Sequence, residues 1–326
     1  MPSMLKSFFI CCLLIFIITC GLFAQGNPSK RNRHSKSTAV LIPAWETMET
    51  AWDYPKNPLK DSLQGNNHVV EQIRSGFEIF IDTPNKAPRF SGNKLSCNNC
   101  HLNAGQKDKA MAIVGIAGVF PEYNKRAGRL ITLEDRIVEC FMRSSNASGK
   151  IDSTSINIIR NGENDILPTA HSREVLALSA YISWISEGFP VGKKIAWRGQ
   201  NVIRAEKLIP VEKLDVKIGE HLYMEKCISC HGEDGQGVEI GDRRAGPLWG
   251  PDSWNDGAGA ARVYTLAGII RYMMPYLDPG SLSEEEAQHI AAFITSKPRP
   301  RYPFKEQDYP TDKVPIDAVY YERRGK

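Results

Sequence analysis

Four stretches of the chain carry apolar residues at intervals of three and four positions, the spacing that places them on one face of an α-helix. These stretches are residues 70–81, 171–186, 216–226 and 283–295. Ser283 and Glu286 have the spacing of a capping box, which marks the start of the last helix. No run of residues alternates between apolar and polar over a length that predicts a β-strand. The pattern therefore predicts a mainly α-helical protein.

The predicted helices fall into two pairs with similar side chains at similar places. In the earlier helix of each pair a glycine precedes an aromatic residue by four positions, and in the later helix an alanine adjoins an aromatic residue. The residues are Gly76, Phe80, Ala180 and Tyr181 in the first pair and Gly219, Tyr223, Ala292 and Phe293 in the second. Because residues four apart share one helical face, we expect each pair of helices to cross at these positions. The repetition predicts two domains of one kind.

The first 24 residues have the pattern of a secretory signal peptide, with Lys6, an apolar run over 8–19 and Ala24 at the expected cleavage site. The run is shorter than the roughly 20 residues that span a bilayer. Residues 25–43 are then expected to form a polar tether. The other processing route is a lipoprotein, because the residues around Cys20 loosely resemble a lipobox and would attach a lipid membrane tether there. Either route predicts a periplasmic protein.

Composition and charge narrow the class of protein. A chain of 326 residues that is 42% hydrophobic and 24% charged is ordinary for about two globular domains, which excludes disordered and collagen-like architectures. Lys and Arg number 41 and Asp and Glu 37, so the formal net charge is only +4. Part of that excess lies in the basic run near residues 30–36. This balance argues against nucleic acid as a partner.

The cysteines carry the strongest chemical signal in the sequence. Three of the eight lie in the signal region, and the odd number that remains does not suit a simple disulfide framework. Four of the others form two copies of one motif, in which Cys97, Cys100 and His101 correspond to Cys227, Cys230 and His231. This is the pattern of c-type haem attachment, because the two thiols add to the haem vinyl groups and the adjacent histidine binds the iron. A zinc site does not explain a histidine directly after each thiol pair.

Together these patterns predict a mainly α-helical protein with two cytochrome c-like domains, each with one covalently attached haem c. We expect the active-site domain over residues 44–200, the electron-transfer domain over 201–300, and the connection between them within 188–213. Prolines after residue 297 prevent a regular helix. The tail over 301–326 is therefore expected to pack extended along the surface.

The sixth ligand of each iron sets its potential and reactivity. For the second haem, Met273 and Met274 lie 42 and 43 residues after His231. Met274 is favoured because its place before proline restricts it to an extended conformation that suits a loop ligand.

For the first haem, Met142 and Cys140 lie 41 and 39 residues after His101. A lone cysteine is more often an inert buried side chain. Here Arg136 and Arg143 lie nearby, and cations and iron both lower the pKa of a thiol, so a metal-bound thiolate at Cys140 is attractive.

Several segments resemble the dihaem thiosulfate dehydrogenases over residues 44–300. They are 97-CNNCHLNAG-105, 117-AGVFPEY-123, 132-TLEDRIVECFMRSSN-146, 246-GPLWGPDSWNDGAG-259 and 272-YMMPY-276. Members of that family oxidise two thiosulfates to tetrathionate in the periplasm, and some favour the reverse reduction. The resemblance implies His101 and Cys140 as axial ligands of the active-site haem, substrate-binding arginines at Arg126 and Arg136, and a nearby serine at Ser144.

The resemblance also implies a route for the electrons. The Cys140 sulfur would form a transient S–S bond with substrate, and the second haem, bound by His231 and Met274, would pass electrons to a small c-type cytochrome or similar acceptor. Some relatives have a lysine immediately before the distal methionine and exchange ligands on reduction. This chain has Met273 there, so that switch is not available. Ser145 and Ala147 also differ from the commonest residues of the family.

Two other functions and one structural role compete with this interpretation. A plain dihaem electron carrier would use Met142 or His171 as the sixth ligand of the first haem. A haem subunit of a multi-component sulfur-oxidising complex would need a partner protein. Arg136 could equally pair with Asp135 or Glu139 on a solvated helix face.

Overall fold

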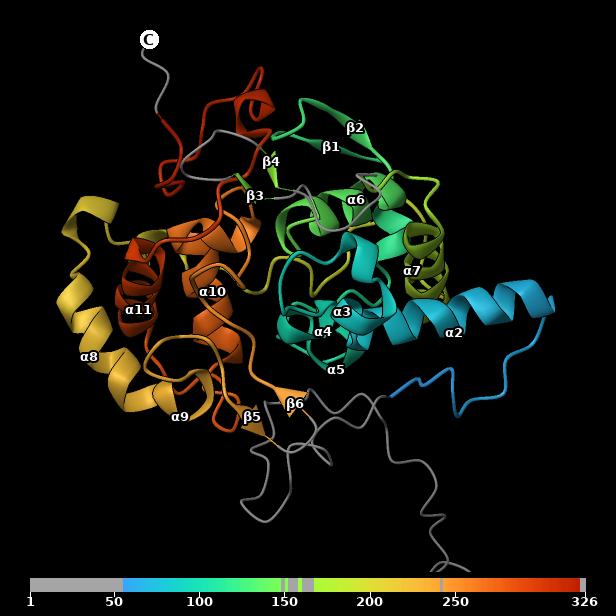
Figure 1. The fold of residues 1–326 in the computed structure, drawn as a ribbon, viewed down its shortest axis with the longest axis horizontal. Coiled ribbons are helices and arrows are strands. Elements are labelled where there is room, and N and C mark those ends of the chain that lie inside the picture. Colours follow the sequence, from blue (N-terminus) through green and yellow to red (C-terminus); the bar gives the residue numbers. More distant parts are fainter. Residues whose placement is uncertain (1–54, 148–149, 152–157, 160–166, 241–242, 323–326) are drawn as a thin grey trace, which may run out of the picture. The chain divides into compact units, whose positions relative to one another are not determined.

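The computed structural model describes residues 55–147, 150–151, 158–159, 167–240 and 243–322 (Figure 1). The predicted signal peptide over 1–24, the tether over 25–43 and Cys20 lie outside the described residues. Residues 39–326 belong to one structural unit, which contains both attachment motifs. Within the described part of the chain, no helix has both the length and the apolar character needed to span a membrane.

Helices dominate the described elements (Figure 1). Up to residue 200 they are α2 (Asn67–Ile81), α3 (Thr83–Lys86), α4 (Cys97–Cys100), α5 (Leu102–Gly105), α6 (Leu133–Arg143) and α7 (Arg173–Ile185), with 3₁₀ turns η2 (Pro88–Phe90) and η3 (Ile116–Val119). Beyond it they are α8 (Val216–Lys226), α9 (Ile228–His231), α10 (Val263–Met273) and α11 (Glu284–Ser296), with 3₁₀ turns η4 (Ala205–Lys207), η5 (Val211–Lys213), η6 (Gly259–Ala261) and η7 (Lys305–Gln307). The four helices that the sequence predicts are α2, α7, α8 and α11.

Side-chain caps explain where several of these helices begin. The Asn66 side chain accepts a hydrogen bond from the backbone N–H of His68 at the start of α2, and Asp215 caps α8 in the same way. The capping box predicted for Ser283 and Glu286 is present at the start of α11. Local hydrogen bonding therefore fixes these boundaries before tertiary packing contributes.

The structure also contains short strands that no alternating pattern in the sequence predicts. Three short antiparallel hairpins are present: β1 (Glu122–Asn124) with β2 (Arg129–Ile131), β3 (Lys150–Ile151) with β4 (Ile158–Ile159), and β5 (Glu239–Ile240) with β6 (Arg243–Arg244). Strands of two or three residues are too short to show an alternating pattern. The loop between β1 and β2 ends at Gly128, whose φ of +65° suits a glycine.

The predicted helix crossings are confirmed in both halves. A Cβ added to Gly76 in α2 would lie 2.0 Å from the Ala177 carbonyl oxygen of α7, and one added to Gly219 in α8 would lie 2.0 Å from the His289 carbonyl oxygen of α11. Only a glycine permits backbones to approach this closely. The predicted aromatic residues complete the two crossings, with ring centroids 5.6 Å apart for Phe80 and Tyr181 and 5.3 Å apart for Tyr223 and Phe293.

Each half has its own hydrophobic core, and a small third cluster joins them. The first core includes Phe77, Phe80 and Tyr181, and the second includes Tyr223 and Phe293. The third cluster brings Leu102 and Ala110, which follow the first attachment motif, against Met273 and Tyr276 of the second half. Packing of the segment after the first motif therefore depends on residues more than 160 positions later in the chain.

The C-terminal tail packs against the rest of the protein. Its described residues contain only the short 3₁₀ turn η7, so the absence of a regular helix up to residue 322 is confirmed. Several tail residues are buried by this packing, and the others are half-buried or exposed. The buried ones are Tyr302, Asp308, Tyr309, Asp317 and Ala318. The two buried aspartates pair with arginines of the globular region, Asp308 with Arg143 and Asp317 with Arg262. Burying a carboxylate requires such a partner.

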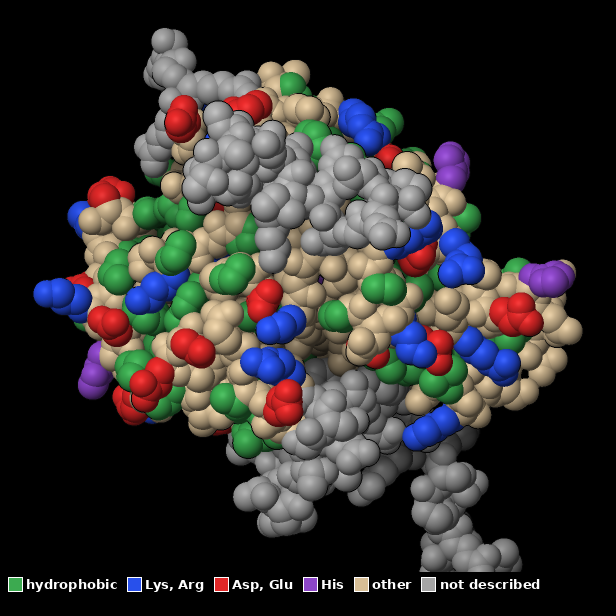
Figure 2. All heavy atoms as spheres, in the orientation of Figure 1, with side chains coloured by type: hydrophobic (Ala, Val, Ile, Leu, Met, Phe, Trp, Pro, Cys, Tyr) green, Lys and Arg blue, Asp and Glu red, His purple; other side chains and the backbone are tan. Residues whose placement is uncertain are grey.

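Charged side chains are interspersed on the face shown in Figure 2. Lys and Arg side chains alternate with Asp and Glu side chains across that face rather than gathering in a region of one sign. This distribution matches the near balance of charge in the sequence.

Candidate active site

The first attachment motif lines a largely apolar cavity of about 400 Å³. Cys97, Cys100 and His101 share its lining with Arg136 and Cys140 of α6. The other walls are mainly hydrophobic: Phe80, Leu95, Ile113, Leu133, Ile137, Leu178 and Ile182, with Ala260, Thr265 and Ile269 from the second half. An apolar cavity with two thiols and an imidazole in its wall fits a covalently attached haem.

A backbone carbonyl orients the histidine of each motif. His101 Nδ1 lies 2.7 Å from the Met111 carbonyl oxygen, and His231 Nδ1 lies 3.1 Å from the carbonyl oxygen of Gly246. Since a carbonyl only accepts hydrogen bonds, Nδ1 carries the proton and the lone pair of Nε2 is left to bind iron. Burial lowers the pKa of both histidines, which favours the neutral ring that coordinates a metal.

The thiols are in the state that haem attachment requires. All five cysteines in the described part of the chain have free thiols, the form that adds to the vinyl groups of haem. Across the same residues, no cluster of three or more His, Cys, Asp or Glu side chains has the arrangement of a metal-binding group. Haem takes only one or two protein ligands at the iron, whereas zinc takes three or four.

Helix α6 presents Cys140 to this cavity. The helix begins at a capping box of Thr132 and Asp135, and Cys140 lies near its end with an accessible side chain on the cavity wall. Met142 and His171 do not belong to the lining of the cavity as the described residues define it. Of the candidate sixth ligands, the structure thus brings Cys140 to the first motif.

The surroundings of the Cys140 sulfur act on its pKa in two directions. Desolvation by the protein raises the pKa of the thiol, whereas the charges of Arg136, Arg126 and Arg143 lower it. The expected effect of the cations is therefore present, but the net shift is upward. Without a bound metal, the loss of water around the thiolate outweighs the nearby positive charges, and the further lowering of the pKa expected from bound iron stays a prediction.

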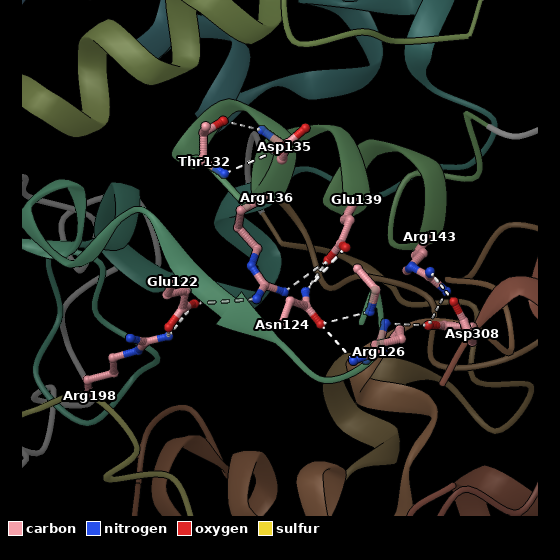
Figure 3. Close-up of polar contacts among 12 residues, drawn as sticks. Glu122, Asn124, Arg126, Thr132, Asp135, Arg136, Glu139, Arg143, Arg198 and Asp308 are labelled. Atoms are coloured by element: carbon pink, nitrogen blue, oxygen red, sulfur yellow. Dashed lines mark hydrogen bonds and ion pairs between the residues drawn. The ribbon is translucent and has the colours of Figure 1, made fainter. Parts of the chain in front are cut away.

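Arg136 is held between two carboxylates (Figure 3). Its Nη1 lies 3.2 Å from Glu139 Oε2, and its Nη2 lies 3.5 Å from Glu122 Oε1. The ion pair that the sequence allows with Glu139 is thus present, whereas Asp135 pairs with Arg129 instead. Arg136 nevertheless lines the cavity. Arg136 therefore pairs with carboxylates and also lies at the candidate active site.

Arg126 and Ser144 approach the same region from different elements. Arg126 lies in the turn between β1 and β2, where its backbone N–H donates to Asn124 Oδ1 and its Nη1 donates to the Gly257 carbonyl oxygen at 2.8 Å (Figure 3). The positive charge of its side chain lowers the pKa of the Cys140 thiol, although Arg126 does not belong to the described cavity lining. Ser144 caps the end of α6 and lines the cavity.

The hairpin of β1 and β2, which holds these arginines, was not predicted from the sequence. Glu122 and Asn124 of β1 hold Arg136 and the Arg126 turn, and Asn124 also donates to Glu139. A signal was present in the sequence, because Asn124 and Gly128 enclose a short polar stretch that is typical of a hairpin loop.

The two methionines near the second motif have different surroundings. Met274 caps the end of α10 in the extended conformation expected before proline. It is partly buried and packs both against the core of the second half, as Cys227 does, and against the cluster of Leu102 and Tyr276. Met273 is only 2% exposed and packs in the cluster with Leu102 and Tyr276. This placement suits Met274 as the ligand, and that role stays a prediction.

Comparison with known proteins finds a cytochrome c family that matches each half of the chain. Residues 86–191 match the SoxA/TsdA cytochrome c domain, and residues 214–294 match the family described as cytochrome c oxidase, cbb3-type, subunit III. The thiosulfate dehydrogenase of Allochromatium vinosum is 39% identical over 74% of this chain and 83% of its own length. That of Stutzerimonas stutzeri is 34% identical over 77% of this chain and 74% of its own length.

The chain belongs to the thiosulfate dehydrogenase family. A solved structure of thiosulfate dehydrogenase (TsdBA) from Marichromatium purpuratum aligns with a TM-score of 0.63 and 32% identity over 78% of this chain. This chain spans about half, 51%, of that longer protein. The predicted fold class, two cytochrome c domains in a mainly helical chain, is confirmed, and such domains imply haem c.

Proposed function

We propose that the protein is a periplasmic dihaem oxidoreductase that couples two thiosulfate ions into tetrathionate and can also catalyse the reverse reaction. The observation that carries this proposal is the shared cavity, which brings the Cys140 thiol and the Arg136 guanidinium to the first attachment motif. Two covalently bound haem c groups would be held by the two motifs, through Cys97, Cys100 and His101 and through Cys227, Cys230 and His231.

The overall reaction determines what the site must supply. Joining two thiosulfate dianions forms one S–S bond and releases two electrons, with no change in bound protons. When bound, the haems supply the two one-electron acceptors for this step. The protein must bring two dianions together against their repulsion, and planar guanidinium groups such as those of Arg126 and Arg136 suit that task.

Cys140 is proposed to act as both a haem ligand and a nucleophile. Its sulfur forms an S–S bond to the outer sulfur of one thiosulfate as two electrons leave. The second thiosulfate attacks that outer sulfur, so tetrathionate departs and the Cys140 thiolate is restored. Ser144, at the end of the same helix, can donate its hydroxyl hydrogen to a sulfonate oxygen in the cavity.

The second half is proposed to carry electrons out of the protein. His231 and Met274 would bind the second iron, and a small c-type cytochrome or similar protein would accept the electrons. Export directed by the predicted signal peptide would put the reaction in the periplasm. In the alternative processing route, cleavage before Cys20 would leave a lipid on that cysteine as a membrane tether. Nucleic acid is not a proposed partner.

Two observations favour the enzyme over the competing functions. Cys140 lines the cavity of the first motif whereas Met142 and His171 are not in its described lining, unlike the arrangement expected of a plain electron carrier. The similarity to thiosulfate dehydrogenases extends over about three quarters of the chain and thus over both halves. A single shared haem domain would not give this coverage.

The test is turnover by the purified, haem-loaded protein. Thiosulfate-dependent reduction of an artificial electron acceptor is measured with tetrathionate assayed as product, for the wild type, Cys140→Gly and Met142→Leu. Loss of the proposed nucleophile and ligand is expected to lower turnover by about 10³-fold or more, with both haems still attached. Met142→Leu removes the competing ligand at similar volume and should retain activity.

Other results would contradict the proposal. Full activity of Cys140→Gly would remove that residue from the mechanism. A first-haem spectrum that changes only in Met142→Leu would favour the electron carrier. A wild type without turnover in either direction would overturn the enzyme assignment.

A further inference from the structure

Arg198 is a third arginine at the candidate site, and it comes from the segment that connects the two halves. It lines the cavity together with Arg136 and Cys140. Its Nη2 donates to both carboxylate oxygens of Glu122, at 2.6 and 2.7 Å, and Glu122 also pairs with Arg136 (Figure 3). The two arginines are therefore neighbours across one shared carboxylate.

The backbone around Arg198 is fixed to the loop that follows the first attachment motif. Trp197 Nε1 donates to the Val114 carbonyl oxygen at 3.0 Å. Asn201 Nδ2 donates to the Lys109 carbonyl oxygen at 2.6 Å, and its Oδ1 accepts from the backbone N–H of Met111. The carbonyl of Met111 also orients His101. Arg198 is thus anchored on both sides to the segment that positions the first haem ligand.

The guanidinium of Arg198 keeps capacity to bind a second anion. Both of its hydrogen bonds to Glu122 use Nη2, and Nη1 and Nε make no hydrogen bond to another described residue. The side chain is 38% exposed, so its pair with Glu122 is weak and an anion can share or replace it. The N–H groups of Nε and Nη1 remain able to donate hydrogen bonds to the oxygens of an anion, because a guanidinium group carries five N–H donors and only those of Nη2 are used by Glu122.

Charge explains why a third arginine is needed. Two thiosulfates, or one tetrathionate, present sulfonate groups at both ends of a sulfur chain. Glu139 offsets much of the charge of Arg136, Glu122 is shared between Arg136 and Arg198, and the Arg126 guanidinium is partly engaged by the Gly257 carbonyl. Arg198 adds a cation where the cavity meets the connecting segment.

We propose that Arg198 binds the sulfonate group at one end of the sulfur chain, beside Arg136, while the other end is bound on the Arg126 side of Cys140. This assignment rests on the proposed function and adds to it a second cationic subsite supplied by the connection between the halves. Glu122 is then the residue that positions both Arg136 and Arg198.

Arg204 provides a matched control for testing this site. It lies in the same connecting segment and, like Arg198, donates to both oxygens of a glutamate, Glu284, but it does not belong to the described cavity lining. Arg198→Gln and Arg204→Gln therefore each remove one positive charge and one arginine–glutamate pair. Arg198→Lys retains the charge without the planar fork.

Three kinds of measurement are made on the full-length, haem-loaded proteins. They are kcat and KM for thiosulfate, the Kd of tetrathionate for the fully oxidised protein by isothermal titration, and the midpoint potential of each haem. Arg198→Gln is expected to raise KM and Kd by about tenfold or more, the effect of losing a charge-assisted contact. Arg198→Lys should recover part of this loss, and Arg204→Gln should match the wild type.

The outcomes separate this inference from the proposed function. Unchanged KM and Kd in Arg198→Gln, beside an active wild type, would overturn the role of Arg198 alone. A changed potential of the first haem with an unchanged Kd would overturn it too, and would assign Arg198 to the haem carboxylates instead. A wild type that neither turns over thiosulfate nor binds tetrathionate would overturn the proposed function together with this subsite.

Discussion

The two halves place their proposed sixth ligands differently. In the first half Cys140 lies within the last turn of helix α6, whereas in the second half Met274 is the residue that directly follows helix α10. The attachment side is alike in both, with one histidine ring held by a backbone carbonyl in each motif. The halves thus share the elements that would hold a haem and differ in the elements that face it. That difference agrees with the proposed division of roles, in which the first half carries out the sulfur chemistry and the second half transfers electrons.

The helix crossings show how freely the shared framework varies. In the first half Tyr181 of the later helix donates its hydroxyl to the Ala104 carbonyl, and in the second half Tyr223 of the earlier helix donates to the Gly232 carbonyl. The tyrosine lies on the later helix in one half and on the earlier helix in the other. In both halves its hydroxyl links the helix crossing to the segment that follows the haem attachment motif. The position of the aromatic pair is therefore maintained more strictly than the identity of either residue.

The C-terminal tail forms one ion pair with each half, and the largest loss of stability is expected from Asp308→Asn, which breaks the pair with the first half. The carboxylate of Asp308 binds Arg143 through two hydrogen bonds, of 2.7 and 2.9 Å, and both side chains are less than a tenth exposed. Losing it leaves a buried guanidinium without a counter-charge, which should lower the free energy of unfolding by about 3 kcal/mol. Asp317→Asn should cost less, because its partner Arg262 is 32% exposed and water can solvate it.

Denaturant unfolding of the two haem-loaded variants compares these pairs directly. An equal loss in both, or a larger loss in Asp317→Asn, would show that burial of the arginine does not decide the strength of the tail contact.

A substitution at the second distal position should affect one haem alone. Met274→Gly removes the proposed ligand and is expected to shift the midpoint potential of the second haem on the order of 100 mV, because axial ligands control haem potential. The first haem should be unchanged. Potentiometric titration followed by visible absorption measures both, with Met273→Leu as the control. A shift in that control and none in Met274→Gly would transfer the ligand role to Met273.

The shared helix crossing should respond equally in the two halves. Gly76→Ala and Gly219→Ala each place a methyl group 2.0 Å from a backbone carbonyl oxygen, so the helices must move apart. We expect each to lower the free energy of unfolding by about 2 kcal/mol. Gly259→Ala meets no atom within 4 Å and should have little effect. A loss confined to one variant would mean that the two crossings are not equivalent.

The smallest expected change in stability comes from an arginine–glutamate pair at the start of α7 and of α11, the later helix of each half. Arg89 binds Glu174 at the start of α7, and Arg204 binds Glu284 at the start of α11, both through Nε and Nη2. The bond from Arg204 lowers the pKa of Glu284 to about 2. A depressed carboxyl pKa stabilises the folded state above its ordinary value near 4.5, and this contribution is lost as the pH falls toward 2.

The difference in unfolding free energy between wild type and Arg204→Gln should therefore be small and should shrink further on acidification from pH 7 to pH 3. The effect is small because Arg204 is exposed to solvent. A difference that grows on acidification would contradict the assigned direction of the pKa shift.

The sequence by itself determined the features that depend on neighbours along the chain or on repetition. The helices follow from apolar spacing, the start of α11 follows from Ser283 and Glu286, and the crossing glycines follow from their recurrence in two halves. The attachment motifs require no tertiary structure to be recognised, because their chemistry lies within five consecutive residues. Resemblance to a family then indicated Cys140, which the structure places at the first motif.

Only the tertiary structure decided which distant charges meet. Arg198 and Glu122 are 76 residues apart, and Arg143 and Asp308 are 165 apart, so no local pattern pairs them. The tail packs against the rest of the protein partly through the ion pairs of Asp308 and Asp317 with Arg143 and Arg262, which the prolines of the tail do not reveal. Long-range ion pairs depend on burial and on the geometry of several elements at once, and periodicity along the chain carries neither.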